Sequence, residues 1–137
     1  MKRILQFAIV ILPLTLISCG HSETADEEAA YRVSGDEIVR SFLDNEQKSS
    51  AKYIDQIIEV SGPIMELAKE NGQVTAVMIS SDEYNIVSCT FQHPINPEEI
   101  AGDQITVKGV CSGFLGDASS MIPGGTLELK RSSLVTQ

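Results

Sequence analysis

Apolar side chains alternate with polar ones over much of this chain, and that period of two residues is the feature that most constrains its fold. In segment 58–64, Ile58, Val60 and Ile64 alternate with Glu59 and Ser61. Such alternation is typical of a strand with one buried and one solvated face. Comparable segments follow at 73–80, 85–91, 103–114 and 126–131. The pattern therefore predicts an all-β domain of five strands.

Turn signals separate the predicted strands. Asn71-Gly72 is a strong signal for a hairpin turn between the first two strands. Between the third and fourth strands, Pro94 and Pro97 interrupt the alternation, and segment 96–102 predicts a short helix that ends at Gly102.

A helix is predicted before the first strand. Ser34 with Glu37 three residues later forms a capping-box pattern, and Ile38 and Phe42 then share one helical face over segment 34–44. The polar stretch that follows is expected to continue or fray this helix up to Tyr53.

Five strands with one internal helical turn between the third and the fourth is the element order of the five-stranded OB-fold barrel. Gly62 and Gly109 lie where two long strands would have to bend around a small barrel. Val60 and Val107 are expected in the core, on the neighbouring first and fourth strands. Another small barrel or a sandwich fits the same alternation, so the pattern alone leaves these alternatives open.

The N-terminus predicts export and lipidation. Lys2 and Arg3 precede the apolar run 7–17, which is too short to span a bilayer and suits a signal peptide. The run ends in Leu16-Ile17-Ser18-Cys19, the pattern of a bacterial lipobox. We therefore expect residues 1–18 to be a cleaved signal peptide and Cys19 to carry acyl chains that anchor the protein to a membrane. Gly20, rather than Asp, favours the outer membrane.

The mature chain is predicted to be strongly acidic. The full sequence has 10 basic and 19 acidic residues, and loss of Lys2 and Arg3 with the signal peptide leaves 8 against 19, a net charge of −11. Segment 19–33 is acidic and lacks apolar periodicity, so it is expected to be a flexible tether before the domain at 34–137. Such a charge repels phosphate backbones, which makes nucleic acid an unfavoured partner.

Three blocks of sequence carry a resemblance to a known family. The first, FLDNEQKSSAKYIDQIIEVSGPI, places an Asn-Glu pair, a Lys-Tyr pair and an aliphatic strand that closes in Ser-Gly. The second is IVSCTF and the third is GDQITVKGVCSGFLGD. In order and spacing they resemble the tRNA-anticodon-binding-like OB-fold family over residues 41–135. The resemblance implies the OB-fold and an envelope lipoprotein, and function still has to be judged from the site.

OB-folds usually bind ligands on the face of strands two and three and the adjoining loops. On this chain we expect that face to present Thr75, Val77, Ile79, Tyr84, Ile86 and Ser88. It has a single aromatic side chain and no basic groove, whereas binding of single strands needs both stacking platforms and positive charge. We therefore expect a protein, peptide or glycan partner, with single-stranded nucleic acid or a purely structural role as alternatives.

Cys89 and Cys111 are expected to point into the barrel. Because the envelope is oxidising and Cys19 is used for lipid, the two remaining cysteines favour a disulfide bond over two buried free thiols. Neither His21 nor His93 has partners at metal-ligand spacing, and no nucleophile has a base or an elbow motif. We expect no cofactor, no metal and no enzymatic activity.

Overall fold

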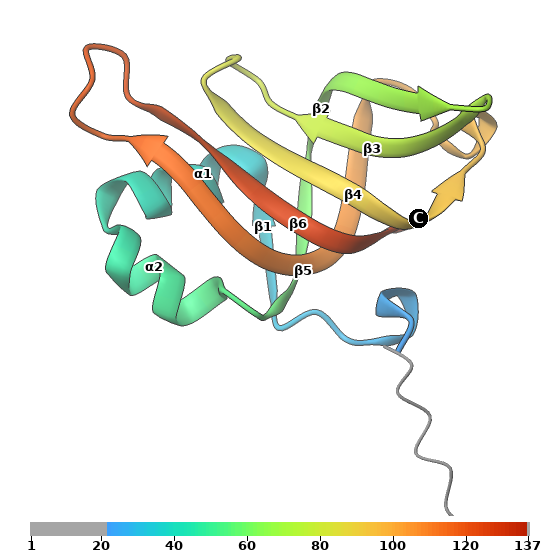
Figure 1. The fold of residues 1–137 in the computed structure, drawn as a ribbon, viewed down its shortest axis with the longest axis horizontal. Helices are drawn as coiled ribbons and strands as arrows, with labels where there is room; N and C mark the ends of the chain where they lie inside the picture. The colour runs from blue at the N-terminus through green and yellow to red at the C-terminus, as the bar shows by residue number, and fades with distance from the viewer. Residues whose placement is uncertain (1–21, 137) are drawn as a thin grey trace, which may run out of the picture.

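The computed structural model describes residues 22–136 (Figure 1), so the predicted signal peptide and Cys19 lie outside the described residues. The elements are η1 (Thr24–Asp26), β1 (Tyr31–Ser34), α1 (Gly35–Asp44), α2 (Glu46–Tyr53), β2 (Ile57–Glu70), β3 (Gln73–Ile79), β4 (Asn85–Ile95), η2 (Pro97–Glu99), β5 (Gln104–Asp117) and β6 (Gly124–Leu134).

Five of the strands close into a barrel. Strand order is β2-β3-β4-β6-β5, and β5 returns to pair with β2, which is the OB-fold order. The long strand β2 has two partners, because its first half pairs with β5 from Ile57 to Pro63 and its second half pairs with β3 from Ile64 to Glu70. The predicted OB-fold barrel is confirmed.

Gly62 lies where β2 passes from one partner to the other. A Cβ atom there would lie 2.6 Å from the Cγ2 atom of Ile79, so no larger residue fits without displacement. Gly109 on β5 is equally crowded, since its Cβ would lie 2.5 Å from the Ser132 hydroxyl oxygen. Both glycines therefore allow close approach where the barrel wall bends, in agreement with the sequence-based expectation.

The predicted turns are also present. Asn71 and Gly72 have φ angles of 51° and 77°, the left-handed values that a two-residue hairpin turn of this kind requires. Segment Pro97–Glu99 forms one turn of 3-10 helix, and Gly102 follows with a φ of 76°.

Helix α1 covers one end of the barrel. The Ser34 hydroxyl accepts a hydrogen bond from the Glu37 N–H, as the capping pattern predicts. Ile38, Val39 and Phe42 are buried against the strands. The Phe42 ring stacks on Phe114 of β5 with ring centroids 4.9 Å apart, so the helix is fixed to the strand that leads into the β5–β6 hairpin.

The prediction of a flexible tether through residue 33 is wrong for most of that segment. Thr24 and Ala29 are buried, and β1 pairs in parallel with the first half of β2, from Tyr31 opposite Ile58 to Ser34 opposite Ser61. The free edge of β2 supplies the reason, because an unpaired strand edge gains backbone hydrogen bonds from any chain laid along it.

We predict that Val60 and Val107 are the most sensitive positions of the barrel. They lie opposite each other on β2 and β5 and are both fully buried. Either one changed to Asp places an unpaired carboxylate in the core and should lower the free energy of unfolding by about 3 kcal/mol or more. Urea denaturation measures this loss.

Glu59→Gln is the matched control. Glu59 lies one residue along, on the outer face, and pairs with exposed Arg32 at 3.4 Å, so its loss should cost below about 1 kcal/mol. Equal sensitivity at positions 59 and 60 would contradict the strand register.

Candidate binding surface

The outer face of β4 carries half of the predicted binding residues. Ile86 and Ser88 point outward and are half-buried, while Tyr84, just before the strand, is 51% exposed. These three side chains are therefore accessible to solvent.

Val77 and Ile79 were expected on this face, and that prediction is wrong. Both are buried in the barrel interior, where they pair with Cys89 and Val87 of β4. The register shifts between Val74 and Ala76, so the strand turns its β-branched residues inward and Met78 outward. Thr75 lies at this shift, half-buried, and its hydroxyl bonds to the Ala68 carbonyl oxygen.

Register brings further apolar side chains together on the outside. Ile86 is opposite Thr126 of β6, and Thr126 is opposite Leu115 of β5, so the three lie in one outward row across adjacent strands. Met78 is opposite Ser88, one step further along β4. Leu115 is 82% exposed and Met78 is 37% exposed.

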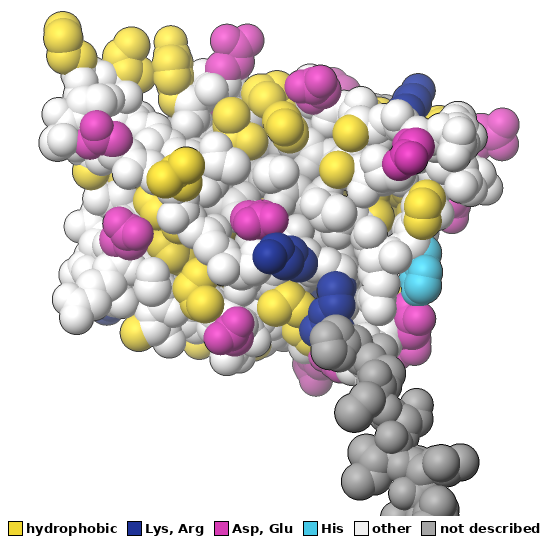
Figure 2. All heavy atoms as spheres, viewed as in Figure 1, with side chains coloured by type: hydrophobic (Ala, Val, Ile, Leu, Met, Phe, Trp, Pro, Cys, Tyr) yellow, Lys and Arg dark blue, Asp and Glu magenta, His cyan; other side chains and the backbone are white. Residues whose placement is uncertain are grey.

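The β5–β6 hairpin extends this row beyond the barrel. Its loop carries Met121 and Ile122, which are 102% and 58% exposed, and Figure 2 shows hydrophobic side chains projecting at the upper left, where Figure 1 places this hairpin. We call the following set the apolar surface: Met78, Tyr84, Ile86, Leu115, Met121 and Ile122. Scattered exposed apolar residues are ordinary, but a gathered set indicates an interaction site.

Sequence reasoning missed Met78, Leu115, Met121 and Ile122. The signal for the last two was present, because two large apolar residues stand in a loop otherwise made of Ser, Gly, Pro and Ala. For Met78 and Leu115 the signal was weaker, since only strand register decides which face each residue occupies.

Phe114 fixes the base of the hairpin to the core. Its ring lies against Gly116 and Gly125, where an added Cβ would come within 2.5 Å of the ring in each case. The same ring stacks on the buried Phe42 of α1. The exposed hairpin is therefore held at its root by a partly buried ring that packs on the core.

A capped loop positions Tyr84. The Asp82 carboxylate accepts hydrogen bonds from the backbone N–H groups of Tyr84 and Asn85, at 3.0 and 2.8 Å, and from the Asn85 amide. Partial burial acts to raise the pKa of Asp82, but these hydrogen bonds outweigh it and hold that pKa below its ordinary value. The Tyr84 carbonyl oxygen then accepts from the Gly125 N–H at 2.9 Å, which ties the loop to β6.

The rim of the apolar surface is acidic. Asp82 and Glu83 precede Tyr84, Asp117 lies opposite Gly124 at the hairpin, and Glu128 is the outward residue next to Thr126 on β6. No Lys or Arg lies in the outward rows that contain Ile86, Met78 or Leu115. Arg40 of α1 is the basic group near this rim, where it acts on Asp82.

Cys89 and Cys111 are both free and buried, so the predicted disulfide bond is absent. Each cysteine lies opposite the same residue, Leu129, from opposite sides of β6. One intervening strand separates their Cα atoms by about 10 Å, whereas a disulfide needs about 4.4–6.8 Å. Burial raises the pKa of each thiol to about 12.

Among residues 22–136, no group of three metal-ligating side chains is found. A hollow of about 380 Å³ lies between η2 and the ends of β5 and β6. Its single titratable residue is Glu99, whose carboxylate is occupied in capping the Asn96 N–H at 2.8 Å. Within the same residues, no helix is both long and apolar enough to cross a membrane.

A closed five-stranded barrel with an exposed surface beside its β5–β6 loop defines an OB-fold domain. The chain belongs to the tRNA_anti-like family, whose model matches residues 1–122. The family resemblance noted in the sequence is therefore confirmed.

Two solved structures are similar at low identity. One is a "putative nucleic acid-binding lipoprotein" from Klebsiella pneumoniae subsp. pneumoniae MGH 78578, with 17% identity, a TM-score of 0.48, and coverage of 77% of this chain and 91% of that chain. The other is a "putative aspartyl-tRNA synthetase" from Leishmania major Friedlin, with 11% identity, a TM-score of 0.37, and coverage of 77% and 21%. No curated protein matches the chain.

We predict that the folded domain does not react with thiol reagents. With a chain that starts at Gly20, a reagent selective for thiolates at pH 8 should modify neither cysteine in the native state and both in denaturant, because burial keeps the thiols protonated. Reductant should leave the melting temperature unchanged, and a melting temperature that drops in reductant would contradict the assignment of free thiols.

The raised pKa values of the two thiols predict that the folded domain loses stability at alkaline pH. An unfolded thiol ionises near 9.0 and the folded one near 12, so the stability that the neutral thiols contribute is complete below pH 9 and falls as the pH rises toward 12.

Proposed function

We propose that this protein is a lipid-anchored, non-catalytic binding module of the bacterial cell envelope, and that its apolar surface contacts another protein. One observation carries this proposal, the gathering of six solvent-exposed or half-buried apolar side chains on β3, β4 and the β5–β6 hairpin. Such a set lies where OB-folds place their ligands, on the strand face and the loop between the last two strands.

The acidic rim favours a partner with basic residues around an apolar centre. Asp82, Glu83, Asp117 and Glu128 surround the surface, and complementary charge speeds association and selects among partners. Single-stranded nucleic acid needs a series of stacking aromatics and a positive groove. The apolar surface offers Tyr84 alone and a negative rim, so a protein or peptide is the better fit.

Anchoring is supported by the sequence Leu16-Ile17-Ser18-Cys19 after a short apolar run. Two or more acyl chains on Cys19 would hold the domain durably at a membrane. Gly20 after the cysteine favours the outer membrane as that location.

We predict that Cys19→Ala blocks lipidation and leaves an uncleaved precursor. Cells fed a clickable fatty acid should label the wild-type protein and not the variant, and the variant should migrate more slowly by gel electrophoresis. Equal labelling of the two would remove the anchor from the proposal.

We predict that the triple variant Leu115→Ser, Met121→Ser and Ile122→Ser folds normally and fails to bind. The three side chains are exposed, so the free energy of unfolding should change by about 0.5 kcal/mol or less at each site. A photo-crosslinking amino acid at position 78 should join the protein to a discrete partner in intact envelopes, and the triple variant should lose this product. The same probe at Glu98, exposed on η2 at the other end of the barrel, is the control.

Purified components test the chemistry of the partner. Labelled peptides that combine Leu with Lys should bind more tightly than peptides that combine Leu with Glu. The triple variant keeps the same net charge, so an affinity loss of about tenfold or more would separate apolar contact from simple charge attraction. Tight oligonucleotide binding at low salt that is lost at moderate salt would instead favour nucleic acid.

A further inference from the structure

Residues Ser22–Ser34, which we call the strap, lie bound along the barrel. Thr24 is fully buried, and the Ala30 N–H donates to the Ile57 carbonyl oxygen at 2.8 Å just before β1 joins β2. Backbone pairing and burial together distinguish the strap from a free linker.

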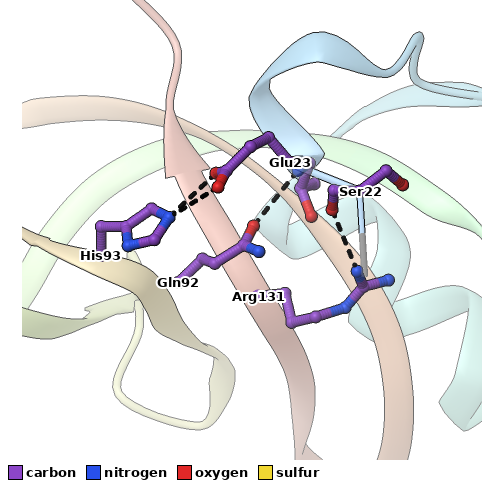
Figure 3. A network of polar contacts seen from close by, with 6 residues as sticks. Ser22, Glu23, Gln92, His93 and Arg131 are labelled. Atoms are coloured by element: carbon purple, nitrogen blue, oxygen red, sulfur yellow. Dashed lines mark hydrogen bonds and ion pairs between the residues drawn. The ribbon is translucent and has the colours of Figure 1, made fainter. Parts of the chain in front are cut away.

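Side chains from three barrel strands hold the first part of the strap. The Lys108 ammonium of β5 donates to the carbonyl oxygens of Ala25 and Glu27 at 2.9 and 2.7 Å. The Gln92 amide oxygen of β4 accepts from the Thr24 N–H at 3.2 Å, and Arg131 of β6 donates to the Ser22 carbonyl oxygen at 3.3 Å (Figure 3).

A further hydrogen bond adds to these contacts, since the His93 Nε2 atom lies 2.9 Å from the Glu23 carboxylate (Figure 3). Both side chains are largely exposed, so the pair contributes little energy by itself. Its position matters more, because it fixes the strap beside β4 only four residues after Cys19.

The strap leaves little chain between the anchor and the barrel. Ser22 is the third residue after Cys19, and three steps along the chain reach at most about 11 Å. If residues 20–34 were free, the same anchor would allow a reach of about 50 Å. A bound strap therefore keeps the barrel against the membrane surface.

The apolar surface lies toward the other end of β6. Arg131 holds the strap, while Gly124 and Thr126 border the apolar surface five to seven residues earlier on the same strand. At the rise of a β-strand this separates the two by roughly 16–23 Å. Figure 1 shows η1 of the strap at the lower right and the β5–β6 hairpin at the upper left.

We propose that the strap orients the anchored barrel, so that the apolar surface faces away from the anchoring membrane and meets a protein in the aqueous compartment. This inference rests on the proposed anchoring and binding surface. It adds that the anchoring bilayer itself is not the partner of the exposed hairpin.

The test uses the chain from Cys19 coupled to vesicles. Since Cys89 and Cys111 are buried and protonated, a maleimide lipid should react at Cys19 alone. This chemical coupling makes the test independent of lipidation in cells. A fluorophore is attached through a clickable amino acid at position 130, which is exposed beside the strap, or at position 121 on the hairpin. Energy transfer to headgroup acceptors in phosphatidylethanolamine–phosphatidylglycerol vesicles then reports distance from the bilayer.

We expect efficient transfer from position 130 and weak transfer from position 121. Lys108→Met, combined with Gln92→Ala and Arg131→Ala, removes the side-chain hydrogen bonds that hold the first part of the strap. Release of this part should make the transfer from the two positions nearly equal. Equal transfer in the unmodified chain, or stronger transfer from position 121, would overturn the proposal.

Two controls separate this inference from the proposed function. The triple variant of Leu115, Met121 and Ile122 should leave the energy transfer of position 130 unchanged while it abolishes partner binding. Hydrogen exchange of the Ala30 N–H reports strap binding without any vesicle or partner. Slow exchange in the unmodified chain and fast exchange in the strap variant, at an unchanged melting temperature, is the expected result, and fast exchange in the unmodified chain would overturn it.

Discussion

The pairing of β2 with β5 is the constraint on which the rest of the structure depends. It closes the barrel through seven register pairs, from Ile57 opposite Val110 to Pro63 opposite Gln104. Because β2 leaves β5 after Pro63 and continues with β3, its opposite edge is free over the first half, and β1 pairs there. Closure also fixes β6 between β4 and β5, which determines where the exposed hairpin and the buried cysteines lie.

Much of the barrel was predictable because its signals are local. Alternation placed Val60 and Val107 in the core, Asn71-Gly72 marked the hairpin, and the Ser34 hydroxyl was correctly assigned as a helix cap. Each of these features depends on the residue itself and a few neighbours in sequence.

The binding surface was harder to predict because it depends on contacts between distant segments. Val77 and Ile79 were assigned to the wrong face, since a register shift near Ala76 cannot be read from alternation alone. Segment 22–33 is polar and acidic, which is typical of a linker, and only the free edge of β2 and the Lys108 side chain explain why it binds. The prediction of a disulfide bond was wrong for the same reason, since the distance between the two cysteines is set by the strand that lies between them.

That intervening strand has a consequence for how the chain can fold under oxidising conditions. A bond between Cys89 and Cys111 requires Cα atoms within about 4.4–6.8 Å, while β6 in its native place holds them about 10 Å apart. A covalent link formed before β6 enters the sheet would hold β4 beside β5 and exclude the C-terminal strand. A bond between the two cysteines is therefore incompatible with the native position of β6, where buried Leu129 lies opposite both of them.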